Sequence, residues 1–174
     1  MLNYPSVERV RELFAYNPNE WFLMWKHRPN GPASWNSRYA ETIAGKPLHV
    51  VTTKGNRVTV DRVNYPTANI CWLHHFGEVI TGIIDHKDRN DFNNSILNLR
   101  PATNSQNTAN TKLNSNNTSG VKGVYWNSYW GKWVAMINID GKKTYIGSST
   151  DLEEAKQIRL KKAIEIYGEF YNAE

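Results

Sequence analysis

Ten asparagines lie between residues 83 and 117, and this segment limits most strongly how the chain can fold. Asparagine side chains bond locally to the backbone and favour turns over regular helices and strands. We therefore expect short elements and many loops in this segment, and clearer helix and strand patterns on either side of it. The asparagines are Asn90, Asn93, Asn94, Asn98, Asn104, Asn107, Asn110, Asn114, Asn116 and Asn117.

The composition excludes several classes of protein. Hydrophobic residues make up 40% of the 174 residues, enough to bury a core, which argues against global disorder. No run of about 18 apolar residues occurs, so we expect no membrane span. The N-terminal sequence MLNYPSVERVRELF carries charges where a secretory signal would be apolar. We therefore expect a cytoplasmic protein.

Cysteine content and net charge narrow the possible classes of protein further. Cys71 is the single cysteine, which excludes a disulfide framework and a zinc site built from several cysteines. The net charge is +5 and the isoelectric point is near 9.3. This balance permits an acidic partner such as nucleic acid but does not by itself establish one.

Capping and hydrophobic patterns predict mixed helices and strands. A helix is expected over residues 6–14 with Ser6 at its N-cap, and another over 69–79. Thr103 and Gln106 form a capping box, which predicts a helix with Asn107 in its first turn. The other expected elements are strands at 21–26, 48–53, 57–63, 83–86, 98–103, 121–126, 132–139 and 142–148, a turn at Asp140-Gly141, and a helix that opens at a Thr150–Glu153 capping box and ends at Tyr167.

A small polar constellation follows the apolar run that ends in Asp85-His86. Asn98 lies 13 positions after Asp85, and Asn107 lies 22 positions after it. Divalent cations such as Mg²⁺ prefer oxygen ligands, which Asp85 and Asn107 supply. His86 can take a proton from an attacking water, and the Asn98 carbonyl can fix its ring by accepting a hydrogen bond from Nδ1. Singly, these residues are more typical of turns, caps and strand ends; the combination indicates phosphodiester hydrolysis.

The same residues carry a resemblance to a known family. The segment IIDHKDRNDFNNSILNLRPATNSQNTAN resembles the ββα-metal motif of HNH homing-type endonucleases of phages and mobile introns. ELFAYNPNEWFLMWKHRP and WLHHFGEV, further upstream, are similar to the sequence that precedes that motif. The resemblance implies that Asp85 and Asn107 bind Mg²⁺ or Mn²⁺, that His86 is the general base, and that Asn98 orients it. Residues 68–70 read Ala-Asn-Ile, where the family carries His-Arg-Leu.

The C-terminal region resembles a second family. SGVKGVYWNSYWGKWVAMINIDGKKTYIGSSTDLEEAK is similar to the plant ethylene-response-factor (Apetala-type) DNA-binding domain, which also occurs fused to phage HNH nucleases. The resemblance implies a three-stranded sheet that enters the DNA major groove, with one helix behind it. Several family arginines are replaced in this sequence, which weakens guanine readout. The resemblance then leaves Lys122, Lys132 and Lys143 to hold phosphates and Asn127 and Asn138 to read adenine. The positions implied to bind DNA are Lys122, Tyr125, Asn127, Trp130, Lys132, Met136, Asn138, Lys143 and Tyr145.

Charge follows the same division of the C-terminal region. Residues 112–149 hold five lysines against one aspartate, whereas residues 151–174 hold four basic and six acidic side chains. The predicted sheet is therefore basic and the predicted helix is not. A basic sheet suits a polyanionic partner, although a solvated lysine face is the alternative interpretation.

Together these patterns predict an α+β protein with two domains. We expect an HNH endonuclease domain at 1–111 with a ββα-metal core at about 78–111, a linker at 112–119, and an ethylene-response-factor-like DNA-binding domain at 120–174. The expected activity is metal-dependent hydrolysis of double-stranded DNA, with no membrane or protein partner. A monomer would nick one strand and a dimer would cut both. A catalytically inactive DNA-binding regulator and an RNA-directed or structure-specific nuclease remain alternatives.

Overall fold

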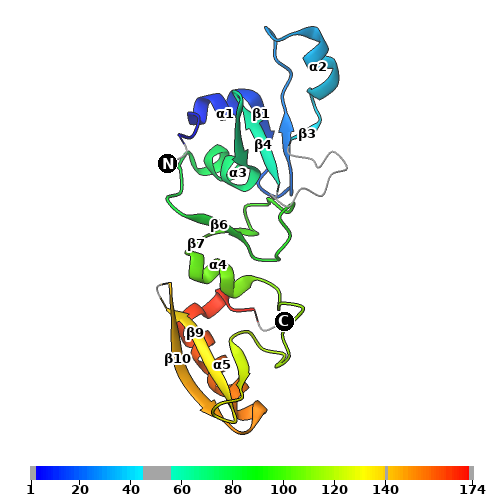
Figure 1. The fold of residues 1–174 in the computed structure, drawn as a ribbon. Helices are drawn as coiled ribbons and strands as arrows, with labels where there is room; N and C mark the ends of the chain where they lie inside the picture. Colours follow the sequence, from blue (N-terminus) through cyan, green and yellow to red (C-terminus); the bar gives the residue numbers. More distant parts are fainter. Residues whose placement is uncertain (1–2, 45–55, 140, 173–174) are drawn as a thin grey trace. The chain divides into compact units, whose positions relative to one another are not determined.

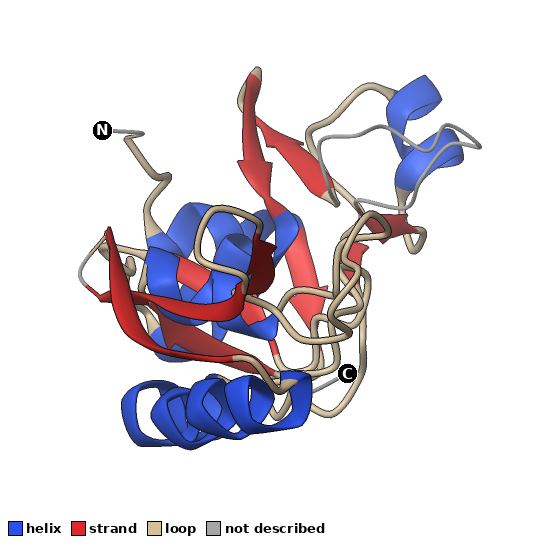
Figure 2. Cartoon of the chain, turned by 60° about the horizontal axis from the view of Figure 1, so that its bottom comes forward, coloured by secondary structure: helices blue, strands red, loops and turns tan. Residues whose placement is uncertain are grey.

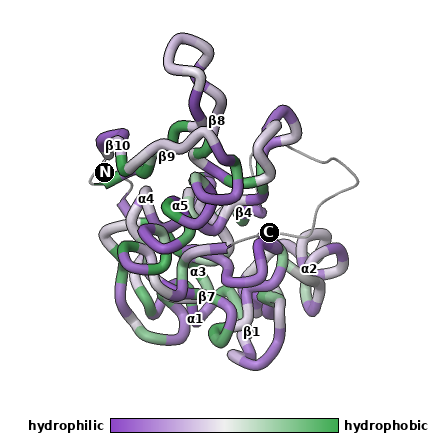
Figure 3. The backbone as a smooth tube through the Cα atoms, turned by 90° about the horizontal axis from the view of Figure 1, so that it is seen from below, coloured by the Kyte–Doolittle hydropathy of each residue, from purple (hydrophilic) through white to green (hydrophobic). Residues whose placement is uncertain are grey.

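The structure is a computed structural model that describes residues 3–44, 56–139 and 141–172. It consists of two compact units, Met1–Pro101 and Ala102–Glu174. Both contain helices and antiparallel strands, which confirms the predicted α+β class. The expected strand at 48–53 and Asp140 of the expected turn lie outside the described residues. None of the helices in the described ranges is long and apolar enough to cross a bilayer; short hydrophobic stretches alternate with hydrophilic ones (Figure 3).

The first unit is built from short elements (Figure 1). The helix α1 begins after Ser6, as predicted, because the Ser6 hydroxyl accepts a hydrogen bond from the backbone N–H of Arg9 at 3.1 Å. Three antiparallel strands form a sheet in the order β1-β2-β3, and two further pairs are β4-β5 and β6-β7. The elements are α1 (Val7–Leu13), β1 (Phe14–Tyr16), β2 (Leu23–Trp25), α2 (Ala33–Tyr39), β3 (Ile43–Ala44), β4 (Arg57–Val60), β5 (Val63–Pro66), α3 (Thr67–Phe76), β6 (Ile83–His86) and β7 (Leu99–Ala102).

One hydrophobic core holds the first unit together and fixes the β6-β7 pair. Leu13 of α1, Ile70 of α3 and the single cysteine, Cys71, are buried in it. Ile84 of β6 and Leu99 of β7 belong to the same core. Burial of these two side chains in the core holds their strands in place. The polar side chains next to them in the sequence are therefore held in place as well.

The second unit is a three-stranded antiparallel sheet with a long helix against it. The strand order is β10-β9-β8, and the long helix α5 runs along the strands at the bottom of Figure 2. Val124, Ala135 and Ala155 form one core cluster between sheet and helix, and Ile137 and Ala163 belong to another. The elements are α4 (Asn104–Asn110), β8 (Val124–Asn127), β9 (Lys132–Ile139), β10 (Lys142–Ser149), α5 (Leu152–Tyr167) and a 3-10 turn at Gly168–Phe170.

Side-chain caps set where the helices of this unit begin. The predicted capping box of α4 is confirmed: Thr103 and Gln106 each bond the other's backbone N–H. The prediction that Thr150 caps α5 is wrong. Asp151 is the N-cap instead, because its carboxylate accepts the N–H of Glu154 at 2.8 Å.

The short helix α4 packs on the second unit. Ala109 is buried in the cluster that contains Ile137 and Ala163. The amine of Lys122 donates hydrogen bonds to the carbonyl oxygens of Ala109, at 2.8 Å, and of Thr111. The division between the units therefore falls before α4, at residues 101–102, whereas the predicted nuclease domain extends to residue 111.

Candidate active site

The loop of residues 87–98, which joins β6 to β7 and which we call the site loop, is tied together by its own polar groups. The backbone N–H of Lys87 donates to the carbonyl of Asn98 at 3.0 Å and closes the loop. Asn98 and Asp88 are paired twice, through Asn98 Nδ2 to Asp88 Oδ1 at 2.9 Å and Asp88 N–H to Asn98 Oδ1 at 3.0 Å. Asn93 Nδ2 donates to the other carboxylate oxygen of Asp88 at 2.7 Å. The loop is thus held as one body.

The Asp88 carboxylate is the centre of these contacts. Burial raises the pKa of Asp88, but hydrogen bonds from the backbone of Asn90 and from the side chains of Asn93 and Asn98 together outweigh it. The pKa of Asp88 therefore lies below its ordinary value of 3.8. Such a shift means that the folded loop prefers the ionised carboxylate.

His86 ends β6 and faces the site loop. Its Nε2 lies 3.2 Å from Oδ1 of Asn94, a side chain that is only 1% exposed. The amide of Asn94 is oriented by a second contact, since its Nδ2 donates to the carbonyl of Phe92 at 3.3 Å. An amide oxygen can only accept, so in this contact His86 donates through Nε2. Oδ1 of Asp91 lies 3.9 Å from Nδ1 of His86.

The side chain against the His86 ring is not the one expected from sequence. Asn98 was expected to accept from Nδ1 of His86. In the structure, both Nδ2 hydrogens of Asn98 go to Asp88 and to the carbonyl of Asn93, and its Oδ1 accepts from Asp88. Asn94 supplies the amide oxygen instead. Residue type cannot distinguish these asparagines, because the choice depends on how the site loop folds.

Asp85, the residue before His86, is paired with a buried arginine that was not among the site residues predicted from the sequence. Arg100 Nε donates to Asp85 Oδ2 at 2.8 Å, and the exposed fractions of the two residues are 8% and 4%. A buried carboxylate requires a compensating partner. Arg100 lies on β7, two residues after Asn98, and β7 pairs with β6. This position in the sequence could have indicated that Arg100 pairs with Asp85.

Three of the four predicted site residues lie in the first unit. Asp85 and His86 end β6, and Asn98 lies at the close of the site loop directly before β7. Asn107 lies on α4 in the second unit, where its side chain is partly buried. Their catalytic and metal-binding roles stay predictions.

The second unit presents a sheet face opposite α5, which we call the outer face. Strand register places Tyr125, Lys132, Met136, Lys143 and Tyr145 on this face, together with Asn127, Val134 and Asn138, because antiparallel partners point to the same side. Trp130, in the β8-β9 turn, contacts the Tyr145 ring edge-on at 6.3 Å. Eight of the nine positions expected to bind DNA thus form or adjoin one surface.

Some of the residues expected to contact DNA are buried or form hydrogen bonds within the protein. Lys122 donates to the end of α4, as described above, rather than lying on the outer face. Asn127 Oδ1 accepts the backbone N–H of Trp130 at 3.0 Å. Asn138 Oδ1 is buried without a hydrogen-bond partner among the described residues. The lysines and aromatic rings of the outer face are therefore its most available groups.

Comparison with known proteins identifies the region that contains this site. Residues 67–109, which run from α3 to α4, match the HNH endonuclease family. The chain is also 34% identical over 87 residues to Protein 3.8 of Escherichia phage T7, an alignment that covers 50% of this chain and 71% of that protein. The chain belongs to the family of T7 Protein 3.8 and carries an HNH endonuclease domain at residues 67–109. The HNH match includes Asp85, His86, Asn98 and Asn107. No solved structure matches the chain significantly.

Proposed function

We propose that this HNH protein is a homing-type, metal-dependent DNA endonuclease in which His86 activates the attacking water. The observation that carries the proposal is the contact between His86 Nε2 and the oriented amide oxygen of Asn94. This contact fixes the orientation of the His86 ring, and a neutral histidine can accept a proton from water. His86 then takes a proton from water as the water oxygen attacks phosphorus and the bond to the leaving oxygen breaks.

Asp85 and Asn107 are the residues we propose to hold a divalent cation. A carboxylate and an amide oxygen are hard donors that fit Mg²⁺ or Mn²⁺, and Mg²⁺ commonly binds few protein groups plus substrate phosphate. Among the described residues, no group of three or more His, Cys, Asp or Glu is placed to bind a metal, so water and phosphate would complete the shell. When bound, the cation would supply positive charge for the transition state. Arg100 holds the Asp85 carboxylate in place.

We further propose that the outer face of the second unit binds double-stranded DNA. The resemblance to ethylene-response-factor domains supports this, as do Lys132 and Lys143 beside the exposed rings of Trp130 and Tyr145. Lysines bind phosphates as point charges, and their contacts are salt-dependent. A tethered DNA-binding unit raises the effective concentration of the nuclease site at its target. The similarity to a T7 protein supports a phage origin and action in the host cytoplasm.

Cleavage of supercoiled plasmid tests the nuclease proposal. The wild-type protein with Mg²⁺ or Mn²⁺ should give open-circle DNA if it nicks, or linear DNA if two copies make paired cuts. EDTA and His86→Ala should abolish the product, whereas His75→Ala, a change of an exposed histidine on α3, should not. Intact plasmid with the wild-type protein would contradict the proposal; retained DNA binding would then favour the inactive regulator.

Salt-dependent binding tests the role of the outer face. Lys132→Ala should weaken duplex binding and reduce the slope of log affinity against log salt by about 1. Lys161→Ala, which removes an exposed lysine of α5, is the matched control and should leave the slope unchanged. Equal slopes for the two variants would contradict the proposed interface.

A further inference from the structure

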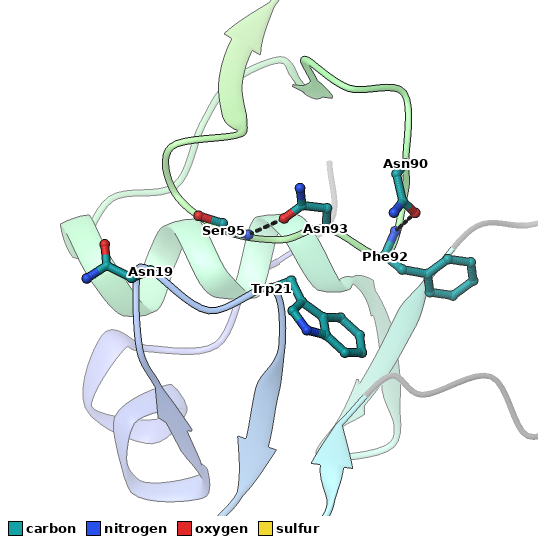
Figure 4. A pocket seen from close by; sticks show the side chains of 6 residues that line it. All are labelled: Asn19, Trp21, Asn90, Phe92, Asn93 and Ser95. Atoms are coloured by element: carbon teal, nitrogen blue, oxygen red, sulfur yellow. Dashed lines mark hydrogen bonds between the residues drawn. The ribbon is translucent and has the colours of Figure 1, made fainter.

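A hollow lies beside the site loop in the first unit (Figure 4). Its volume is about 580 Å³, within the range of roughly 300–1,000 Å³ found for small-ligand pockets. We call it the aromatic hollow. It is lined by Asn19, Trp21, Asn90, Phe92, Asn93 and Ser95.

Hydrogen bonds join the two segments that wall the aromatic hollow. The backbone N–H of Asn94 donates to the carbonyl of Trp21 at 3.0 Å. The backbone N–H of Ile96 and the hydroxyl of Ser95 both donate to the carbonyl of Pro18, at 3.0 and 3.1 Å. The site loop and the segment before β2 are thus fixed to each other, and the hollow is formed before any ligand arrives.

The lining of the hollow is aromatic, amide-rich and uncharged. Trp21 is 48% exposed and Phe92 is 40% exposed, and both rings extend to the same side in Figure 4. The side-chain amide of Asn19 has no hydrogen-bond partner among the described residues, so it is available to a ligand. Since none of the six lining side chains is a cation, a phosphate is poorly matched. A flat, neutral group with a polar edge fits, and a nucleobase has that chemistry.

We propose that the aromatic hollow binds one unpaired or extruded nucleobase of the DNA strand at the cleavage site. A base inside a duplex is stacked on both faces, so only an unstacked base can meet the Trp21 or Phe92 ring. Asn94 links the hollow to His86, because its backbone bonds Trp21 while its side chain bonds the histidine. A base held here fixes the strand beside the attacking water. The inference rests on the proposed nuclease function and names a subsite for it.

Binding of single-stranded DNA without metal tests the hollow. The full-length His86→Ala protein in EDTA is titrated with a labelled 12-nucleotide strand of mixed sequence and with an abasic strand of the same length. Adding Trp21→Ala should weaken binding of the base-containing strand by about 5- to 150-fold, the range of base–aromatic stacking. It should leave the abasic strand unchanged. Trp21→Phe should restore most of the affinity, and Tyr39→Ala, a change of another exposed aromatic, should have no effect.

The outcomes separate this inference from the proposed function. If Trp21→Ala fails to fold, as judged by circular dichroism, Phe92→Ala is measured in its place. Unchanged affinity for the base-containing strand, or equal loss on the abasic strand, would overturn the inference even if plasmid is cleaved. Base-dependent loss of affinity in a protein that never cleaves plasmid would support the hollow and overturn only the nuclease proposal.

Discussion

His86 Nε2 lies 3.2 Å from Asn94 Oδ1, and this contact fixes the orientation of the histidine ring. Asn94 is buried, its amide is turned by the carbonyl of Phe92, and its backbone carbonyl accepts the Tyr16 hydroxyl at 2.6 Å. The acceptor is therefore fixed before DNA binds. A fixed partner that orients a catalytic histidine is a recurrent arrangement in enzymes.

Removing the Asn94 side chain should slow the chemical step. We expect Asn94→Ala to lower kcat by about 100-fold with KM within two-fold, because a misplaced general base costs about this much in rate. Steady-state cleavage rates over a range of DNA concentrations give both constants. Asn114→Ala, at an exposed position of the same asparagine-rich segment, is the control. A rise in KM with unchanged kcat would show that Asn94 acts in DNA binding instead.

The buried Asp85–Arg100 pair should be costly to break from one side. Arg100→Met leaves the Asp85 carboxylate without its guanidinium, which should lower the free energy of unfolding by about 3–5 kcal/mol. Asp85→Leu combined with Arg100→Met should recover much of this loss. Urea denaturation measures both, with Arg38→Met on the exposed side of α2 as control. A loss under about 1 kcal/mol for Arg100→Met would contradict the burial of the pair.

Acid should loosen the site loop through Asp88. The folded-state pKa of Asp88 is lowered, so its contribution to stability is fully present above the ordinary value of 3.8. It is lost as pH falls through the lower folded-state pKa. The midpoint of urea denaturation is measured from about pH 2 to about pH 6, on either side of that value. As the pH falls, this midpoint should drop less steeply for Asp88→Asn than for the wild type. Glu20→Gln, which removes an exposed carboxylate near the same loop, is the control and should follow the wild-type curve. If the curves of all three proteins coincide, the proposed role of Asp88 is contradicted.

Lys122 should act in stability and not in DNA affinity. Its amine bonds the carbonyls of Ala109 and Thr111 at the end of α4, where a cation also complements the helix dipole. Lys122→Met should destabilise the protein by about 1.5–3 kcal/mol, the usual contribution of hydrogen bonds to a charged group. Thermal unfolding measures the loss, with exposed Lys112→Met as control. Wild-type stability combined with weakened duplex binding would return Lys122 to the predicted DNA-contact set.

The sequence predicted the features that depend on local pattern. Ser6, Thr103 and Gln106 cap helices where expected, and the alternation along β9 placed Lys132 and Met136 on one face. The side-chain contacts that depend on the three-dimensional fold were not predicted. The roles of Asn94 and Asn98 against His86 depend on the path of the site loop, and every asparagine in that segment has the same chemistry. The packing of α4 depends on burial of Ala109. One small apolar side chain does not make a hydrophobic pattern that can be recognised in the sequence.

The most direct test of the central claim is chemical rescue of the proposed base. His86→Gly should lose metal-dependent plasmid cleavage by at least about 100-fold, the lower range for general-base catalysis. Added imidazole should restore part of the rate, and the rescue should saturate. His75→Gly should cleave as the wild type does, with no response to imidazole. Undiminished cleavage by His86→Gly would contradict the assignment of His86 as the residue that activates water.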